Sequence, residues 1–130
     1  MRVYFFLILI LLIGCDPGSM EEYRYEGESV SRLLCNDLVK IESTGDLKAQ
    51  APKLKKKFVQ LTELMIKAKK HQLMHPEEVQ IREVNMYLSD QLKMELMRLY
   101  QIEGCQMVIE DLQRESLHKL DLFAEQYSKN

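Results

Sequence analysis

The sequence predicts an all-α protein: an elongated bundle or hairpin of three or four helices behind an N-terminal anchor. After residue 28, apolar residues recur at intervals of three and four, which is the period of one face of a helix. The 130 residues include only five glycines and three prolines, too few for a chain of many short strands and turns. This length suits one small domain.

The first fifteen residues, MRVYFFLILILLIGC, differ from the rest of the chain. Arg2 is their only charge, and the apolar run over residues 3–13 would rise about 16 Å as a helix, against a bilayer core of about 30 Å. A charged start, a short apolar run and a small residue are typical of a secretory signal peptide, expected here over residues 1–14. The alternative, a buried N-terminal core helix or strand, is disfavoured because the run has no polar face.

The end of this run, Leu12-Ile13-Gly14-Cys15, resembles the lipobox of bacterial lipoprotein precursors. The resemblance implies a diacylglycerol on the Cys15 thiol, cleavage before Cys15 and usually a further acyl chain, such as palmitate, on the new amine. Two or three acyl chains anchor a protein stably in a membrane. A signal that is uncleaved, or cleaved in the ordinary way, is the alternative.

The lipobox also implies a location. We expect the protein in the bacterial cell envelope, anchored to a membrane by the lipid on Cys15. Asp16, directly after the cysteine, resembles the inner-membrane retention signal of enterobacterial lipoproteins and favours the inner over the outer membrane. Export removes the domain from nucleic acid, which is therefore not an expected partner.

Residues 15–27 are expected to form a flexible tether, because Pro17, Gly18 and Gly27 punctuate them without an apolar period. Twelve flexible residues span about 20 Å on average, enough to hold the domain clear of the headgroups. The helical domain is then expected over residues 28–130.

Two helices are expected in the first half of that domain. The first, near residues 29–42, has the apolar face Val30, Leu33, Leu34, Leu38 and Ile41. The second has the clearest apolar stripe: Leu47, Ala51, Leu54, Phe58, Leu61, Met65 and Ala68. It is expected to begin near Ala51, because Pro52 costs about 3 kcal/mol in a helix interior but little in a first turn. Phe58, the largest residue of the stripe, is expected in the core.

The second half contains the remaining helices. Pro76-Glu77-Glu78 resembles a helix start, and the apolar period from Ile81 to Leu99 predicts a third helix to about Glu103. A fourth is expected after Gly104. Because one glycine costs only about 1 kcal/mol in a helix, one long bent helix over 77–126 is the alternative.

Charge is segregated along the chain. Residues 48–70 contain eight lysines and one acid, whereas residues 77–125 contain eleven acids and five basic residues. One explanation is that the lysine-rich helix packs beside acidic helices with complementary faces. The other is a surface for anionic lipid or an acidic envelope polymer, formed by Lys55, Lys56, Lys57, Lys67, Lys69 and Lys70.

Candidate chemical sites are sparse. His71 and His75 have the i, i+4 spacing of paired metal ligands, but Pro76 disfavours helix at His75 and no further His or Cys lies near. Methionines at helical spacing are more often flexible core residues than soft-metal ligands. The sequence contains neither a phosphate loop nor a nucleophile motif. We therefore expect no enzyme, no metal site and no cofactor.

The two remaining cysteines leave two alternatives open. An even number of cysteines in an exported protein can form a disulfide, which here would join Cys35 and Cys105 and close a loop of about 70 residues. Alternatively, both are buried thiols that act as small apolar residues.

The expected function is that of a non-enzymatic envelope lipoprotein whose helical surfaces bind a protein partner. A pilotin-like assembly factor of a secretion system is one alternative, similar only in size, anchor and helix content. A lipid-anchored enzyme or metal-binding protein is another, disfavoured by the lack of a catalytic motif.

The anchor makes the first prediction. Cys15→Ser removes the thiol that would carry the lipid, so it should abolish incorporation of labelled fatty acid and processing at this position. A Cys15→Ser protein that is still lipidated and held in the membrane like the wild type would contradict the lipoprotein interpretation.

Overall fold

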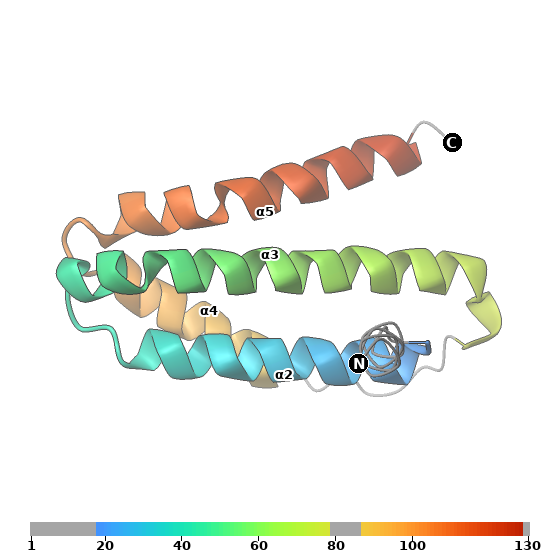
Figure 1. Cartoon of the computed structure of the whole chain (residues 1–130), viewed down its shortest axis with the longest axis horizontal. Coiled ribbons are helices and arrows are strands. Elements are labelled where there is room, and N and C mark those ends of the chain that lie inside the picture. The colour runs from blue at the N-terminus through green and yellow to red at the C-terminus, as the bar shows by residue number, and fades with distance from the viewer. Residues whose placement is uncertain (1–17, 79–86, 129–130) are drawn as a thin grey trace, which may run out of the picture.

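The protein is described by a computed structural model that places residues 18–78 and 87–128 (Figure 1). In these two segments it forms four α-helices and one 3-10 turn, with no strand. The elements are α2 (Met20–Val39), α3 (Thr44–Met74), η1 (Pro76–Glu78), α4 (Tyr87–Tyr100) and α5 (Cys105–Ser128). The expected all-α, elongated architecture is confirmed.

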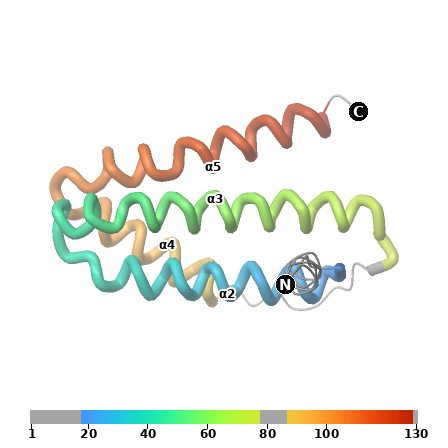
Figure 2. Tube along the Cα trace, in the orientation of Figure 1, coloured from blue at the N-terminus to red at the C-terminus, as the bar shows by residue number. Residues whose placement is uncertain are grey.

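The helices are arranged around α3, the longest of them. α3 lies between α2 and α5, antiparallel to α2 and in the same direction as α5 (Figures 1 and 2). α4 lies behind this layer in Figure 1, where it packs mainly against α2 and touches α5. The N-terminus of α2 and the C-termini of α3 and α5 are therefore at one end of the bundle.

α2 begins well before the position expected from sequence. Ser19 caps the helix by accepting a hydrogen bond from the Glu22 N–H at 3.3 Å, and the Glu22 carboxylate accepts one from the Gly18 N–H at 2.6 Å. This reciprocal pair satisfies amides that a helix start would leave free. Residues 20–27 are thus helical, and the expectation of a flexible tether over 15–27 is wrong for them.

α3 also begins earlier than expected, at Thr44 rather than near Ala51. The Ser43 side chain accepts the Asp46 N–H at 3.1 Å, and Asp46 accepts the Glu42 N–H at 3.1 Å. Pro52 therefore lies inside the helix, where it provides no N–H. Complete burial of Leu47 and Leu54 on either side offsets that cost.

The third expected helix is described in part, because residues 79–86 lie outside the described residues. Pro76–Glu78 is a 3-10 turn, Ile81 and Val84 lie outside the described residues, and the chain is helical as α4 from Tyr87 to Tyr100. At the other end the chain reverses between α4 and α5. Gly104 adopts φ +84° there, a conformation that a side chain disfavours. The alternative of one long helix over 77–126 is therefore wrong.

The hydrophobic core occupies one end of the bundle, which we call the closed end. It combines the C-terminal halves of α2 and α4 with the N-terminal halves of α3 and α5. Its buried apolar residues are Val30, Leu34, Cys35, Leu38, Ile41, Leu47, Leu54, Phe58, Leu99, Cys105, Ile109 and Leu112. At the other end, which we call the open end, large apolar residues such as Leu73, Met74 and Leu122 are exposed.

Two polar contacts join the helices at the closed end. The Arg98 guanidinium of α4 donates to the Leu38 carbonyl at 2.8 Å and to the Ile41 carbonyl at 3.0 Å, which satisfies acceptors at the end of α2. The Thr44 hydroxyl of α3 donates to the Glu103 carbonyl in the turn before α5, at 2.5 Å. These contacts hold both chain reversals together.

The position of Phe58 makes the second prediction. Its side chain is only 7% exposed, so Phe58→Ala should leave a cavity and lower the free energy of unfolding by about 3–5 kcal/mol. Met65→Ala, seven residues along the same face but half exposed, should change it by about 0.5 kcal/mol or less. Urea unfolding of both variants measures the difference, and equal midpoints would show that Phe58 does not support the core.

Candidate functional site

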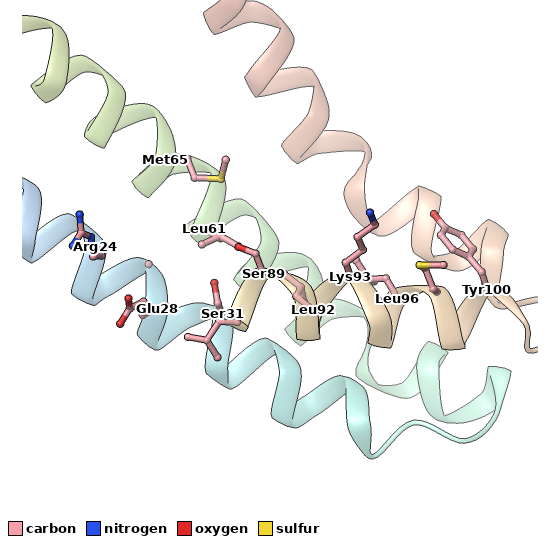
Figure 3. Close-up of a pocket in the computed structure, with 13 residues that line it drawn as sticks. Arg24, Glu28, Ser31, Leu61, Met65, Ser89, Leu92, Lys93, Leu96 and Tyr100 are labelled. Atoms are coloured by element: carbon pink, nitrogen blue, oxygen red, sulfur yellow. The ribbon is translucent and has the colours of Figure 1, made fainter. Parts of the chain in front are cut away.

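An apolar groove of about 700 Å³ lies between α2, α3 and α4 (Figure 3). We call it the α4 groove. Its apolar walls are Leu61 and Met65 of α3 and Leu88, Leu92, Leu96 and Met97 of α4. Arg24 and Glu28 of α2 and Lys93 of α4 add charges of both signs. The groove is therefore an apolar surface with polar groups at its margin.

Helical spacing explains how α4 forms one wall. Leu88, Leu92 and Leu96 are four residues apart and share one face of the helix. Leu92 and Leu96 also pack against the core, which fixes the wall to the closed end of the bundle. On the α2 side, a Cβ placed on Gly27 would meet nothing within 4 Å, so this small residue leaves the groove open.

The groove provides binding groups rather than a catalytic constellation. Its lining contains hydroxyls from Ser31, Ser89 and Tyr100 and one carboxylate, Glu28, but neither histidine nor cysteine. No nucleophile there is paired with a base. Within residues 18–78 and 87–128, no three His, Cys, Asp or Glu side chains are grouped so as to hold a metal ion.

The lysines predicted from sequence divide into two groups. Lys57 forms an ion pair with Asp37 of α2 in a partly buried contact. The Nζ atom of Lys55 lies 3.7 Å from the carboxylate oxygen Oε2 of Glu115 in α5. These pairs support the complementary-face explanation for the first part of α3. Lys56, Lys67 and Lys69 form no ion pair with any other described residue.

A second groove, which we call the α5 groove, lies between the diverging ends of α3 and α5 and measures about 370 Å³. Its apolar lining is Ile66, Leu122 and Phe123, and its cations are Lys67, Lys70 and Lys119. Glu63 accepts a hydrogen bond from Lys119 at 2.9 Å. Lys69 does not line this groove, so the structure separates it from its neighbours in sequence.

Two of the three histidines, His71 and His75, lie at the open end of the bundle, in and just after the last turn of α3. The rings of His71 and His75 are 4.6 Å apart, and Tyr23 of α2 lies 5.6 Å from His71. His75 Nδ1 is 3.2 Å from the Glu77 carboxylate. These contacts join the start of α2 to the end of α3.

The cysteines of the domain are separate, free thiols. Both Cys35 and Cys105 are buried, and Cys105 Sγ lies 3.6 Å from the Thr44 hydroxyl. Burial, together with the nearby Glu95 carboxylate, raises the pKa of Cys35, which keeps this thiol protonated and unreactive. In the structure no disulfide joins Cys35 and Cys105, and both occupy the core as small residues.

Cys15, the expected site of lipid attachment, and the other residues that resemble a lipobox lie outside the described residues. Within the described part of the chain, no helix combines the length and the apolar character needed to cross a membrane. No family model, no curated protein and no solved structure matches the chain.

The Asp37–Lys57 pair makes the third prediction. Burial alone would raise the pKa of Asp37, but the ammonium groups of Lys57 and Lys53 outweigh it and hold the pKa below its usual value. A depressed carboxylate pKa stabilises the fold above the unfolded-state pKa of about 3.9, and this contribution is lost as pH falls through the folded-state pKa.

Since the Asp37 side chain is only 11% exposed, Asp37→Asn should lower the free energy of unfolding by about 1.5–3 kcal/mol at pH 7. The difference from wild type should shrink at pH values below about 4. Asp111→Asn, which removes an exposed pair with Arg114, is the control. Urea unfolding across this pH range measures the effect, and equal stabilities of wild type and Asp37→Asn at pH 7 would contradict it.

Proposed function

We propose that this protein is a lipid-anchored, non-enzymatic module of the bacterial cell envelope, and that its α4 groove binds an amphipathic helix of a protein partner. The observation that carries the binding proposal is the groove itself, with apolar walls and charges at the margin. This is the surface used in helix-in-groove recognition. The lipobox residues Leu12-Ile13-Gly14-Cys15 support the anchor.

The dimensions of the groove suit a helix. Its α4 wall extends from Leu88 to Tyr100, about 18 Å along the helix axis. This length accommodates about three turns of a docked helix, whose apolar residues at i, i+4 and i+7 would face the leucines of α4. A partner of this kind would bring its own polar face to the solvent side of the groove.

Two side chains of the groove are suited to partner binding. Met65 of α3 and Met97 of α4 are both more than half exposed, although they belong to apolar faces. Methionine has an unbranched, polarizable side chain that adapts to different apolar surfaces. The charged residues that line the groove, Arg24, Lys93 and Glu28, have a net charge of +1 (+2 − 1). A partner helix with acidic flanks would therefore be favoured.

The fourth prediction tests this groove by photo-crosslinking in cells. A photoreactive phenylalanine at Met97 should crosslink to a specific envelope protein, because Met97 lines the groove. The same residue at Met94, which is exposed on α4 outside the groove, should not. Mass spectrometry identifies the crosslinked protein, and binding is then measured with that protein purified.

In the binding measurement, Met97→Glu should weaken the affinity about 30-fold or more, as for a central interface residue. Met94→Glu is the matched control and should leave the affinity unchanged. Equal crosslinking from both positions, or an affinity that Met97→Glu does not change, would overturn the proposal for the groove.

A further inference from the structure

The early start of α2 brings the bundle close to the proposed lipid anchor. Cys15 lies five residues before Met20, the first residue of α2. Five residues span at most about 18 Å. If Cys15 carries the lipid, the N-terminus of α2 therefore stays within about 18 Å of the membrane, and the open end of the bundle faces it.

The α5 groove lies toward this same end. The N-terminus of α2 and the C-termini of α3 and α5 are together at the right of Figure 1. The groove is formed by residues 63–70 of α3, within about three turns of its C-terminus, and by residues 119–126 in the second half of α5. Leu73, Met74, Leu122 and Tyr127 are large apolar or aromatic side chains exposed here. These side chains are therefore exposed at the same end of the bundle as the proposed anchor.

The charges around the groove favour an anionic surface. Three lysines line it against one carboxylate, Glu63, which gives a net charge of +2 (+3 − 1). Lys70 Nζ lies 6.0 Å from the centre of the Phe123 ring, so cation and aromatic ring share one side of the groove. Cations beside aromatic and aliphatic side chains are typical of surfaces that lie in the headgroup layer of a membrane.

Apart from Glu63, the described acidic residues of this end do not line the groove. At 100° per residue, Asp121 lies 100° or more from each of Lys119, Leu122 and Phe123, whereas Glu125 lies 60° from Leu122, at the edge of this face. Glu21 and Glu22 are in the first turn of α2, which packs on α3 rather than on α5. An anionic bilayer would therefore be repelled from those faces and attracted to the groove.

We propose that the α5 groove docks on the surface of an anionic phospholipid bilayer. Lys67, Lys70 and Lys119 would contact the phosphates, while Leu122 and Phe123 would enter the interface between headgroups and acyl chains. This inference deepens the proposed function, because it rests on the lipid at Cys15 for proximity. It assigns Lys67 and Lys70 to the membrane and leaves Lys55 and Lys57 to their contacts within the bundle.

The fifth prediction uses the fact that the chain contains no tryptophan, so that one introduced tryptophan is a unique fluorescent reporter. Leu122→Trp places it in the groove, at a position that is 52% exposed. Met107→Trp is the control near the closed end of the same helix, at a position that is 78% exposed. Each full-length lipidated protein is reconstituted into vesicles whose acyl chains carry brominated quenchers.

In vesicles of phosphatidylcholine with phosphatidylglycerol, the Leu122→Trp fluorescence should be quenched and shifted to shorter wavelength. The Met107→Trp fluorescence should be neither quenched nor shifted. Quenching at Leu122→Trp should be lost in phosphatidylcholine alone and in 1 M salt, where screening shortens to about 3 Å. The lipid anchor itself should still hold the protein on the vesicles in both conditions.

Charge reversal supplies the second comparison. Lys67→Glu combined with Lys70→Glu should abolish the quenching at Leu122→Trp, because it reverses two of the three cations in the groove. Lys48→Glu combined with Lys56→Glu changes the same number of exposed lysines on α3 outside the groove and should preserve the quenching.

Equal quenching at the two reporter positions, or equal quenching in neutral and anionic vesicles, would overturn the docking proposal. So would no quenching at all, which would leave the groove to an acidic protein or polymer. The mass of the purified protein reports lipidation separately. Failure of the anchor and failure of the groove are therefore distinguished, since a protein without the lipid contradicts the anchor, and only protein whose mass includes the lipid enters the comparison of the two reporters.

Discussion

The confinement of apolar burial to one end of the bundle determines the rest of the structure. On α3 and α5 the last buried residues are Thr62 and Ser116, both close to the middle of their helices. Beyond them α5 diverges from α3, as Figure 1 shows. The Ser116 hydroxyl is buried without a hydrogen-bond partner among the described residues, at a cost of about 1–3 kcal/mol. Both grooves lie where this close packing ends.

The closed end is stable because its two chain reversals are joined by specific contacts. Arg98 satisfies carbonyls at the end of α2, and Thr44 contacts the turn that Gly104 makes possible. A Cβ on Gly104 would lie 3.3 Å from the Thr44 hydroxyl oxygen, so the close approach and the positive φ require the same residue. These contacts position α4 beside α2, and the α4 groove is a consequence of that position.

The sequence predicts the core of this protein better than its helix ends. Leu54, Phe58, Ile109 and Leu112 follow the helical period and are buried. The apolar period alone places the starts of α2 and α3 too late, because it does not include the capping residues Ser19 and Ser43. Each is a capping residue followed three positions later by an acid, Glu22 or Asp46, a pattern that marks a helix start.

The grooves themselves are not predictable from the period. Met65 belongs to the same stripe as Phe58, yet it is exposed because none of the four described helices covers that part of α3. How far two helices diverge depends on side chains from several elements at once, and the apolar pattern of one helix does not contain this information. The complementary charges of Asp37 and Lys57 likewise come together only when α2 and α3 pack.

The two grooves lie on opposite sides of α3, and this arrangement relates the two proposed interactions. Leu61 and Met65 face the α4 groove, whereas Glu63, Ile66, Lys67 and Lys70 face the α5 groove. At 100° per residue the mean directions of these two sets differ by about 170°. A bundle that docks on a bilayer through the α5 groove therefore presents the α4 groove to the aqueous side. Membrane docking and partner binding would not compete, and the bilayer would orient the partner site.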